Sequence, residues 1–219
     1  MNFESVLNIL GFFSAFCIVD NLLRQYSRLE GIYYLLHAIH NGLIVKATYM
    51  DVLRTWAGFG SVSYEPTMYA LELVFALHFY HVFIYWRKFR FDDWLHHILM
   101  IGIALPIGGY FPAGSLLGYG LFFTTGLPGG IDYALLFLVR NAWLDRMKEK
   151  QVNAFLNVWV RSPGCASHAC FTFAYVSLIT APFTGMWWAG MFTGLLTYWN
   201  GQYFMRQVVE NALQRDHVL

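Results

Sequence analysis

Three pairs of histidines each lie within an apolar stretch of about twenty residues, the length that crosses the hydrocarbon core of a bilayer. The pairs are His37/His40, His78/His81 and His96/His97. Imidazole is costly to expose to lipid tails, so side chains of this kind normally face protein or a polar cavity. The pattern predicts a chain that spans a membrane and encloses a polar interior.

Composition agrees with this class. The chain has 219 residues, of which 58% are hydrophobic and 12% are charged, more apolar than a soluble core and its surface require. We therefore expect an all-α polytopic membrane protein with about seven transmembrane helices. The net charge of +1 and the lack of a basic stripe argue against a nucleic-acid partner. The three cysteines lack metal-ligand spacing, so no metal site is predicted from them.

Seven apolar segments are expected to cross the membrane. Twelve of the fourteen lysines and arginines fall in alternate connections, so the positive-inside rule places the C-terminus in the cytosol and the N-terminus in the lumen. We expect a first helix and turn over residues 1–30, a transmembrane domain over 31–206 and a cytosolic tail over 207–219. The predicted spans are Ser5–Leu23, Ile32–Met50, Pro66–Trp86, Trp94–Phe111, Ser115–Val139, Gly164–Thr180 and Gly185–Tyr203.

The connection from Asn141 to Arg161 mixes basic residues with large apolar ones, including Trp143, Phe155 and Trp159. This mixture is typical of a helix that lies in the membrane interface, and two tryptophans suit that position. We expect such a helix on the cytosolic side. A solvated connector is the alternative.

The orientation of the spans places all three histidine pairs in the cytosolic half of the membrane, because alternate helices run in opposite directions. Residues three or four apart share a helix face, whereas the adjacent His96 and His97 point about 100° apart. A lone intramembrane histidine often serves only as a hydrogen-bond partner between helices. The convergence of several favours a site. The residues expected to line it are His37, His40, Asn41, His78, His81, Thr124, Thr125 and His168.

The fifth span contains Pro128, Gly129 and Gly130, which predict a break or kink in the helix. Asp132 would then lie in the first turn of the resumed helix, at the depth of the histidines, where the helix dipole favours a carboxylate. We predict that Asp132 acts with His96 and His97, since a nearby carboxylate can fix the tautomer of an imidazole. A purely structural role at the helix start is the alternative.

Three segments carry a resemblance to a known family: Asp92-Asp93-Trp94-Leu95-His96-His97-Ile98, Gly129-Gly130-Ile131-Asp132-Tyr133 and Leu156-Asn157-Val158-Trp159-Val160-Arg161-Ser162-Pro163-Gly164. The chain resembles the TLC-domain family, which includes the ceramide synthases, from about Tyr33 to Met205. The resemblance implies six helices ringed around a lipid-sized pocket, with the histidine pair at its polar end. It also implies an endoplasmic reticulum membrane.

In the ceramide synthases the histidine pair takes part in acyl transfer from acyl-CoA to a sphingoid amine, and the matching positions here are His96 and His97. The resemblance therefore implies a membrane lipid partner, an acyl chain or a sphingoid base, and acyl-CoA as a possible donor with no bound cofactor. Where ceramide synthases carry a further histidine and paired aspartates, this chain carries a single acid, Asp132. Lipid binding without chemistry is therefore an open alternative.

Two further classes compete with this interpretation. Membrane desaturases and hydroxylases gather histidines at the cytosolic face as iron ligands, although they use about eight of them. The chain would otherwise be a non-catalytic subunit of a larger membrane complex, including one of the mitochondrial inner membrane, or a homodimer. Copurification in fixed stoichiometry would distinguish a subunit from a lipid-loaded protein.

Overall fold

The computed structural model describes residues 2–58, 67–111 and 113–216, and in these residues every regular element is a helix. The α-helical segments join through short 3-10 or π-helical turns into seven continuous helices. They are α1 (Phe3–Tyr26), α2 (Ile32–Ala57), α3 (Met68–Tyr85) with η1 (Trp86–Lys88), α4–η2–α5 (Phe91–Leu99, Met100–Ala104, Leu105–Tyr110), α6–η3–α7 (Ser115–Leu121, Phe122–Gly126, Leu127–Arg140), α8–η4–α9 (Arg146–Leu156, Asn157–Arg161, Ser162–Ile179) and α10 (Gly185–Asp216).

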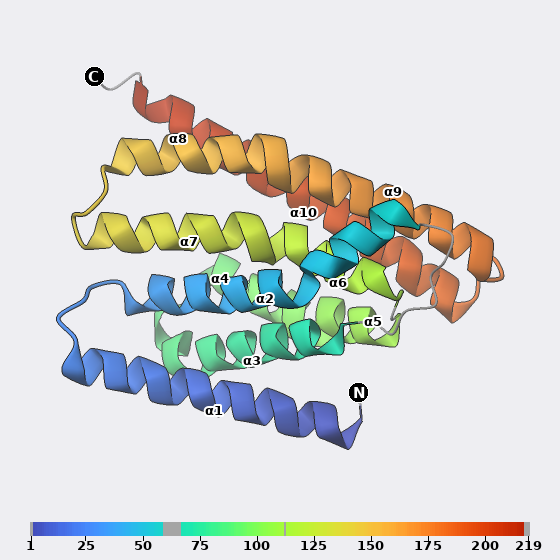
Figure 1. The fold of residues 1–219 in the computed structure, drawn as a ribbon, viewed down its shortest axis with the longest axis horizontal. Coiled ribbons are helices and arrows are strands. Elements are labelled where there is room, and N and C mark those ends of the chain that lie inside the picture. The colour runs from blue at the N-terminus through green and yellow to red at the C-terminus, as the bar shows by residue number, and fades with distance from the viewer. Residues whose placement is uncertain (1, 59–66, 112, 217–219) are drawn as a thin grey trace.

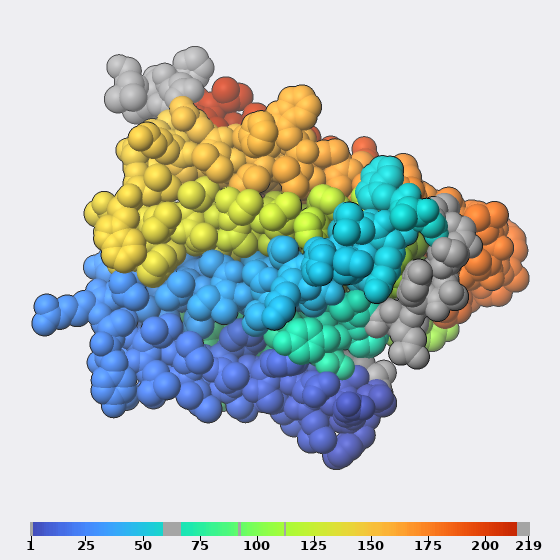
Figure 2. Space-filling view, in the orientation of Figure 1, coloured from blue at the N-terminus to red at the C-terminus, as the bar shows by residue number. Residues whose placement is uncertain are grey.

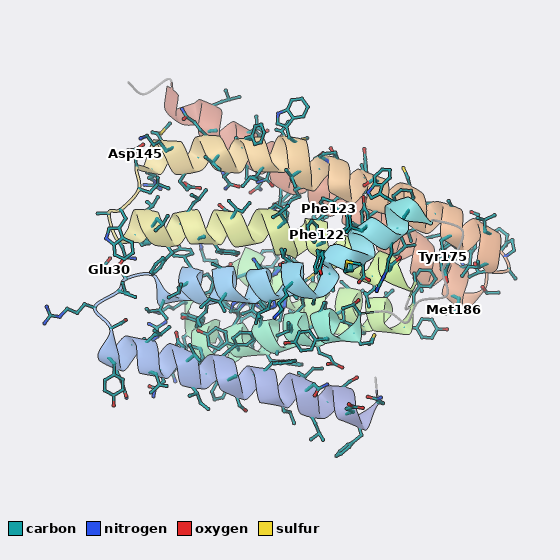
Figure 3. All side chains as sticks on the ribbon, viewed as in Figure 1. Glu30, Phe122, Phe123, Asp145, Tyr175 and Met186 are labelled. Carbon is teal, nitrogen blue, oxygen red and sulfur yellow. The ribbon has the colours of Figure 1, made fainter. Side chains whose placement is uncertain are left out.

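The helices lie side by side with their long axes roughly parallel, and successive helices run in opposite directions (Figure 1). Glu30 and Asp145 mark one end of this bundle, and Tyr175 and Met186 mark the other (Figure 3). We call the first the basic end, because Arg24, Arg87 and Arg140 close the helices that finish there. On the face seen in Figure 2, the side chains of α1, α2, α7 and α8 form a continuous layer.

Three helical segments are long and apolar enough to cross a membrane: Phe3–Tyr26, Met68–Lys88 and Ser115–Arg140. Helix α3 is the most enclosed of these, since its residues from Ala70 to His78 are all buried. A helix that is apolar on every side belongs in the interior of a helical assembly. Large apolar side chains cover the outside instead, as in α1, where Leu7, Leu10 and Ile18 are exposed.

Three of the seven helices contain a π-helical turn, and each turn is explained by a proline. Pro106, Pro128 and Pro163 lie inside continuous helices, and the turns Met100–Ala104, Phe122–Gly126 and Asn157–Arg161 are each centred four residues earlier. A helical proline lacks an N–H and its ring collides with the carbonyl four residues before it. The wider π turn moves that carbonyl away and lets the helix continue.

The prediction at Pro128–Gly130 was a break or a kink. A break is wrong, because the π turn accommodates the proline and the helix continues to Arg140. Asp132 lies in the second turn of α7 rather than at a free helix start. The two glycines have another role. A Cβ on Gly129 would lie 2.8 Å from Nδ2 of Asn41, and one on Gly130 would lie 3.3 Å from the Asn41 Cβ. They allow α7 and α2 to pack closely.

The predicted interfacial segment is helical, and its location in a membrane interface stays a prediction. The segment from Arg146 to Arg161 runs into α9 without interruption (Figure 1) and packs against α7 and α10. Its apolar side chains Phe155 and Trp159 face outward, with 60% and 68% of their surface exposed, whereas Glu149 and Asn157 are buried. The pattern is amphipathic as expected, and neighbouring helices cover the part of its polar face that carries Glu149 and Asn157.

The predicted domain boundary at residue 206 does not correspond to a change in structure. Helix α10 continues without interruption from Gly185 to Asp216, so the part of the expected tail that the structure describes is helical. Lys150 of α8 donates a hydrogen bond to the carbonyl of Asn211 over 3.3 Å. The end of α10 therefore packs against α8 at the basic end.

Candidate functional site: a histidine cluster near the basic end

The structure brings the three histidine pairs together between α2, α3 and α4. The rings of His37 and His81 stack with centroids 4.3 Å apart. Nε2 of His78 lies 3.3 Å from Nε2 of His96, and Nε2 of His97 lies 3.4 Å from Nδ1 of His81. We call these six residues the histidine cluster: His37, His40, His78, His81, His96 and His97.

The hydrogen bonds determine which nitrogen carries the proton in several of these rings. Nδ1 of His37, His78 and His97 each contact the carbonyl oxygen four residues earlier in the same helix, over 2.6, 2.7 and 2.7 Å. A carbonyl only accepts, so these Nδ1 atoms are donors and, in the neutral ring, each Nε2 is an acceptor. The carbonyls of Tyr33, Val74 and Asp93 thus perform the orienting role that we expected from a carboxylate.

This assignment extends to the partner rings. Nε2 of His78 accepts, so His96 donates to it through Nε2; Nε2 of His97 accepts, so His81 donates through Nδ1. The remaining nitrogen of His81, Nε2, is then an acceptor, and it is buried without a hydrogen-bond partner. The cluster therefore presents unsatisfied basic nitrogen, which attracts a hydrogen-bond donor.

One member of the cluster is accessible from outside. The other five histidines are at most 8% exposed, whereas His96 belongs to the exposed class. This difference follows from the angle of about 100° between adjacent residues on a helix. His97 points inward, where its ring stacks on Phe89 with centroids 4.5 Å apart. Among the six histidines, His96 is therefore the one that reaches the surface of the bundle.

Tyrosines enclose the cluster on the side of α2 and α7, and the sequence analysis assigned them no role. The ring of Tyr133 lies 4.3 Å from that of His37, and the ring of Tyr33 lies 5.2 Å from that of His81. Tyr33 precedes His37 by four residues, so extending the helical spacing of the first pair backwards would have found it. Tyr133 required knowledge of how α7 is rotated.

Asn41 connects the cluster to the fifth continuous helix. Its Oδ1 accepts hydrogen bonds from Nδ1 of His40 over 2.9 Å and from Oγ1 of Thr125 over 3.0 Å. Nε2 of His40 is buried and has no partner. Asn41 and Thr125 thus lie beside the histidines as expected, and they orient the His40 ring.

Asp132 is not placed with His96 and His97. It precedes Tyr133 by one residue, which is about 100° around α7, so it does not share the direction in which Tyr133 faces the cluster. The charged groups that act on its carboxylate are Glu149 and Arg161. The predicted combination of two histidines and this aspartate is therefore split between two sides of α7.

Arg161, like the two tyrosines, is a residue whose position the sequence did not predict, since it was expected among the basic residues at the cytosolic surface. The structure places it 15 residues from Arg146 along one helix, about 22 Å inside the bundle. Its NH1 donates to Oδ1 of Asn157 over 3.3 Å, and its guanidinium lies 5.1 Å from the ring centre of Phe204. Polar residues recur every four positions along this helix up to Arg161, and this spacing was the signal in the sequence that Arg161 shares their inward-facing side.

His168 and Thr124 line a separate cavity of about 120 Å³, so His168 does not join the cluster. Its Nε2 lies 3.1 Å from the carbonyl of Leu116, to which it donates. The cavity lies between α3, α4–η2–α5, α6–η3, α9 and α10, and most of its lining is apolar. Met100, one turn after His96 and His97, also lines it, which places the cavity next to the cluster.

Among the described residues, no three histidines, cysteines or acids are arranged to hold a metal ion. No family model matches the chain, and comparisons with curated proteins and with solved structures found no match.

Proposed function

We propose that this chain is a multipass membrane protein that binds a long-chain lipid within its helical bundle, with the polar part of the lipid at the histidine cluster. All seven helices would cross the membrane with the basic end in the cytosol, as in a TLC-domain protein of the endoplasmic reticulum. The apolar outer surface and the inward-facing polar groups support this arrangement. The cavity of about 120 Å³ would hold one short segment of hydrocarbon, since about 150 Å³ accommodates benzene.

The observation that carries this proposal is the set of acceptor nitrogens in the histidine cluster. Nε2 of His81 is buried and unpaired, and its tautomer leaves it free to accept a proton. A lipid hydroxyl or amine would donate to such a nitrogen, and an imidazole near neutral pH can also remove its proton. The cluster thus suits activation of an amine or hydroxyl.

Acyl transfer is the reaction that we propose for this site. His96 is accessible at the basic end, where a soluble acyl-CoA would approach, and the neighbouring Arg87 and Arg90 would attract its phosphates. An imidazole can accept the proton of the attacking amine or receive the acyl group itself. We assign these roles to His96, whose Nδ1 is left as an acceptor when its Nε2 donates to His78. His97, whose two nitrogens are engaged by Asp93 and His81, positions the cluster, and Asp132 has no catalytic role.

The test compares the purified protein with the double variant His96→Ala/His97→Ala and with Ile98→Ala. Ile98 lies on the same helix turn and is 59% exposed, so it is a matched control outside the cluster. Mass spectrometry would identify the retained lipids, and labelled acyl-CoA would report acyl transfer to candidate amines and alcohols. We expect the double variant to lose acyl transfer and change the retained lipid, and Ile98→Ala to resemble the wild type.

Identical retained lipids in all three proteins, without acyl transfer in any, would contradict the proposal. Copurification with other subunits in fixed stoichiometry, without lipid, would instead support the accessory role. Metal analysis of the same preparation addresses the iron-enzyme alternative.

A further inference from the structure

Arg161 is a cation inside the bundle for which the described part of the chain offers no ion pair. The three ion pairs found there involve Arg24, Arg54 and Arg206. The Nε atom of Arg161 is buried and has no hydrogen-bond partner. Its contacts are a neutral amide, Asn157, and the face of Phe204. A guanidinium held in this way keeps donors available for an anion.

The nearest acid leaves this cation incompletely paired. Asp132 acts on Arg161 electrostatically, but the two do not approach within ion-pair distance, and Oδ1 of Asp132 is itself buried without a partner. Removing a charge from water costs several kcal/mol unless a close partner compensates it. The arrangement is that of a binding site for an anion, with Asp132 as a competing and more distant counter-charge.

The apolar cavity ends close to Arg161. Asn200 lines the cavity and precedes Phe204, the ring beneath Arg161, by one helical turn. Oδ1 of Asn200 is buried without a partner. On the other side, NH2 of Arg161 and Nδ2 of Asn41 both lie within 4 Å of the point that a Gly129 Cβ would occupy. Hydrocarbon and anion sites are therefore adjacent.

We propose that Arg161 binds the carboxylate of a single-chain fatty acid whose hydrocarbon chain enters the cavity between α5, α6, α9 and α10. A carboxylate matches the planar fork of a guanidinium, which can donate two parallel hydrogen bonds to it. Nδ2 of Asn41 is a further donor beside it. A longer chain would pass Phe192, which lines the cavity and is 40% exposed, and continue into the bilayer.

This inference rests on the proposed lipid-binding function and names the class of lipid. It concerns the side of α7 that faces α8, whereas the acyl-transfer proposal concerns the histidine cluster on the other side. A fatty acid bound at Arg161 is a ligand whose hydrocarbon chain occupies the same cavity as that of the substrate, since acyl transfer from acyl-CoA yields an amide or ester and free CoA rather than a free acid. The two proposals can therefore fail separately.

The experiment measures binding of palmitate, hexadecanol and hexadecyl phosphate to the full-length protein in detergent, by competition with a fluorescent fatty acid. These probes share chain length and differ in the polar group. We expect palmitate to bind most tightly and Arg161→Gln to weaken palmitate at least tenfold while leaving hexadecanol within twofold. Arg161→Lys should retain part of the affinity, since the charge remains but the fork is lost.

Two further variants make the result specific. Asp132→Asn removes the competing carboxylate, so palmitate should bind at least threefold more tightly. Arg206→Gln removes an exposed arginine of α10 that pairs with Glu210, and it should leave palmitate affinity unchanged. Ile98→Ala, the exposed control on α4, should also bind palmitate within twofold of the wild type.

Equal palmitate affinity in wild type and Arg161→Gln would overturn the inference, as would hexadecanol binding as tightly as palmitate. Hexadecyl phosphate displacing palmitate at lower concentration would overturn the carboxylate assignment. If Arg161→Gln fails to fold, unchanged or weaker palmitate binding in Asp132→Asn would be the contradicting result, because that variant keeps the arginine and removes its competitor.

Discussion

Nδ1 of His81 on α3 donates a hydrogen bond to Nε2 of His97 on α4 over 3.4 Å. The turn between the two helices brings these residues together. The direction of this bond follows from Asp93, whose carbonyl holds the proton of His97 on Nδ1. One backbone carbonyl at the start of α4 thus determines the tautomer of a histidine on α3. The unpaired acceptor of His81 is a consequence of this chain of hydrogen bonds.

Replacing His97 should destabilise the protein through His81. In His97→Phe the ring shape is approximately kept, but the Nδ1–H of His81 loses its acceptor in a buried position. An unsatisfied buried donor costs about 1–3 kcal/mol, so we expect a lower unfolding temperature in detergent. Ile98→Ala is the control on the same turn and should change stability by less than about 1 kcal/mol. Equal stability of His97→Phe and wild type would show that the bond does not form.

Gly129→Ala should separate α2 from α7. In most helix interiors this change stabilises by about 1 kcal/mol, because alanine is the better helix former. Here the new Cβ would lie 2.8 Å from Nδ2 of Asn41, so we expect destabilisation and weaker lipid retention. Gly42→Ala, on α2 beside Asn41, meets nothing within 4 Å and should be neutral or stabilising. Thermal unfolding of both variants measures the contrast, and similar shifts for both would refute close packing at Gly129.

Residues on the outward face of the helix that begins with α8 should lie at increasing depth in the membrane. Nitroxide labels at residues 152, 155 and 159 would each lie deeper than the last, by about 1.5 Å per residue along the helix axis. A helix lying in the interface would instead hold all three at one depth. Electron paramagnetic resonance with oxygen and a water-soluble nickel complex measures these depths in bilayers. Equal depths for the three labels would contradict this prediction and would support a helix that lies in the membrane interface, as the amphipathic sequence indicated.

Glu149 should make stability fall as pH rises. It lies at the basic end, outside the predicted spans, beside a cavity of about 190 Å³ that Arg146 and Lys150 also line. Burial raises the pKa of the Glu149 carboxyl, against the opposing effect of Lys150. The fold therefore favours the neutral acid, and its stabilising contribution, complete below the ordinary pKa of 4.5, is lost as pH rises through the raised value.

Glu149→Gln removes this dependence. We expect the unfolding temperature of the variant to exceed that of the wild type by more at pH 7.5 than at pH 4. Glu210→Gln is the comparison, since the Glu210 side chain is 49% exposed and pairs with Arg206. It should show no such increase. A difference between Glu149→Gln and wild type that stays constant with pH would contradict burial of the charge.

Hydropathy and helical spacing predicted the seven helices and the approach of the three histidine pairs. Both predictions depend on how far along its helix each residue lies, and the sequence gives that position directly. Asp132 was misplaced because its neighbours depend on the rotation of α7, and the preceding π turn changes that rotation by one residue. The depth of Asp132 alone does not distinguish the side of Tyr133 from the side of Arg161.

Arg161 and the orientation of α8 were missed for a related reason. An amphipathic pattern shows that two faces differ, but not whether water or other helices cover the polar face. Trp159 fits an outward position in both arrangements. Only the packing of α7 and α10 against Glu149 and Asn157 shows that the polar face is inside.

The prolines that accompany the π turns divide three helices into two segments each, and the π turn determines how the side chains of one segment are rotated relative to those of the other. Each turn contains one residue more than α-helical periodicity would allow, so losing that residue would rotate one half of the helix by about 100° against the other. The cluster at the basic end and the cavity beyond it therefore depend on the lengths of the segments Met100–Ala104 and Phe122–Gly126, because a deletion in either would rotate one set of lining side chains away from the other.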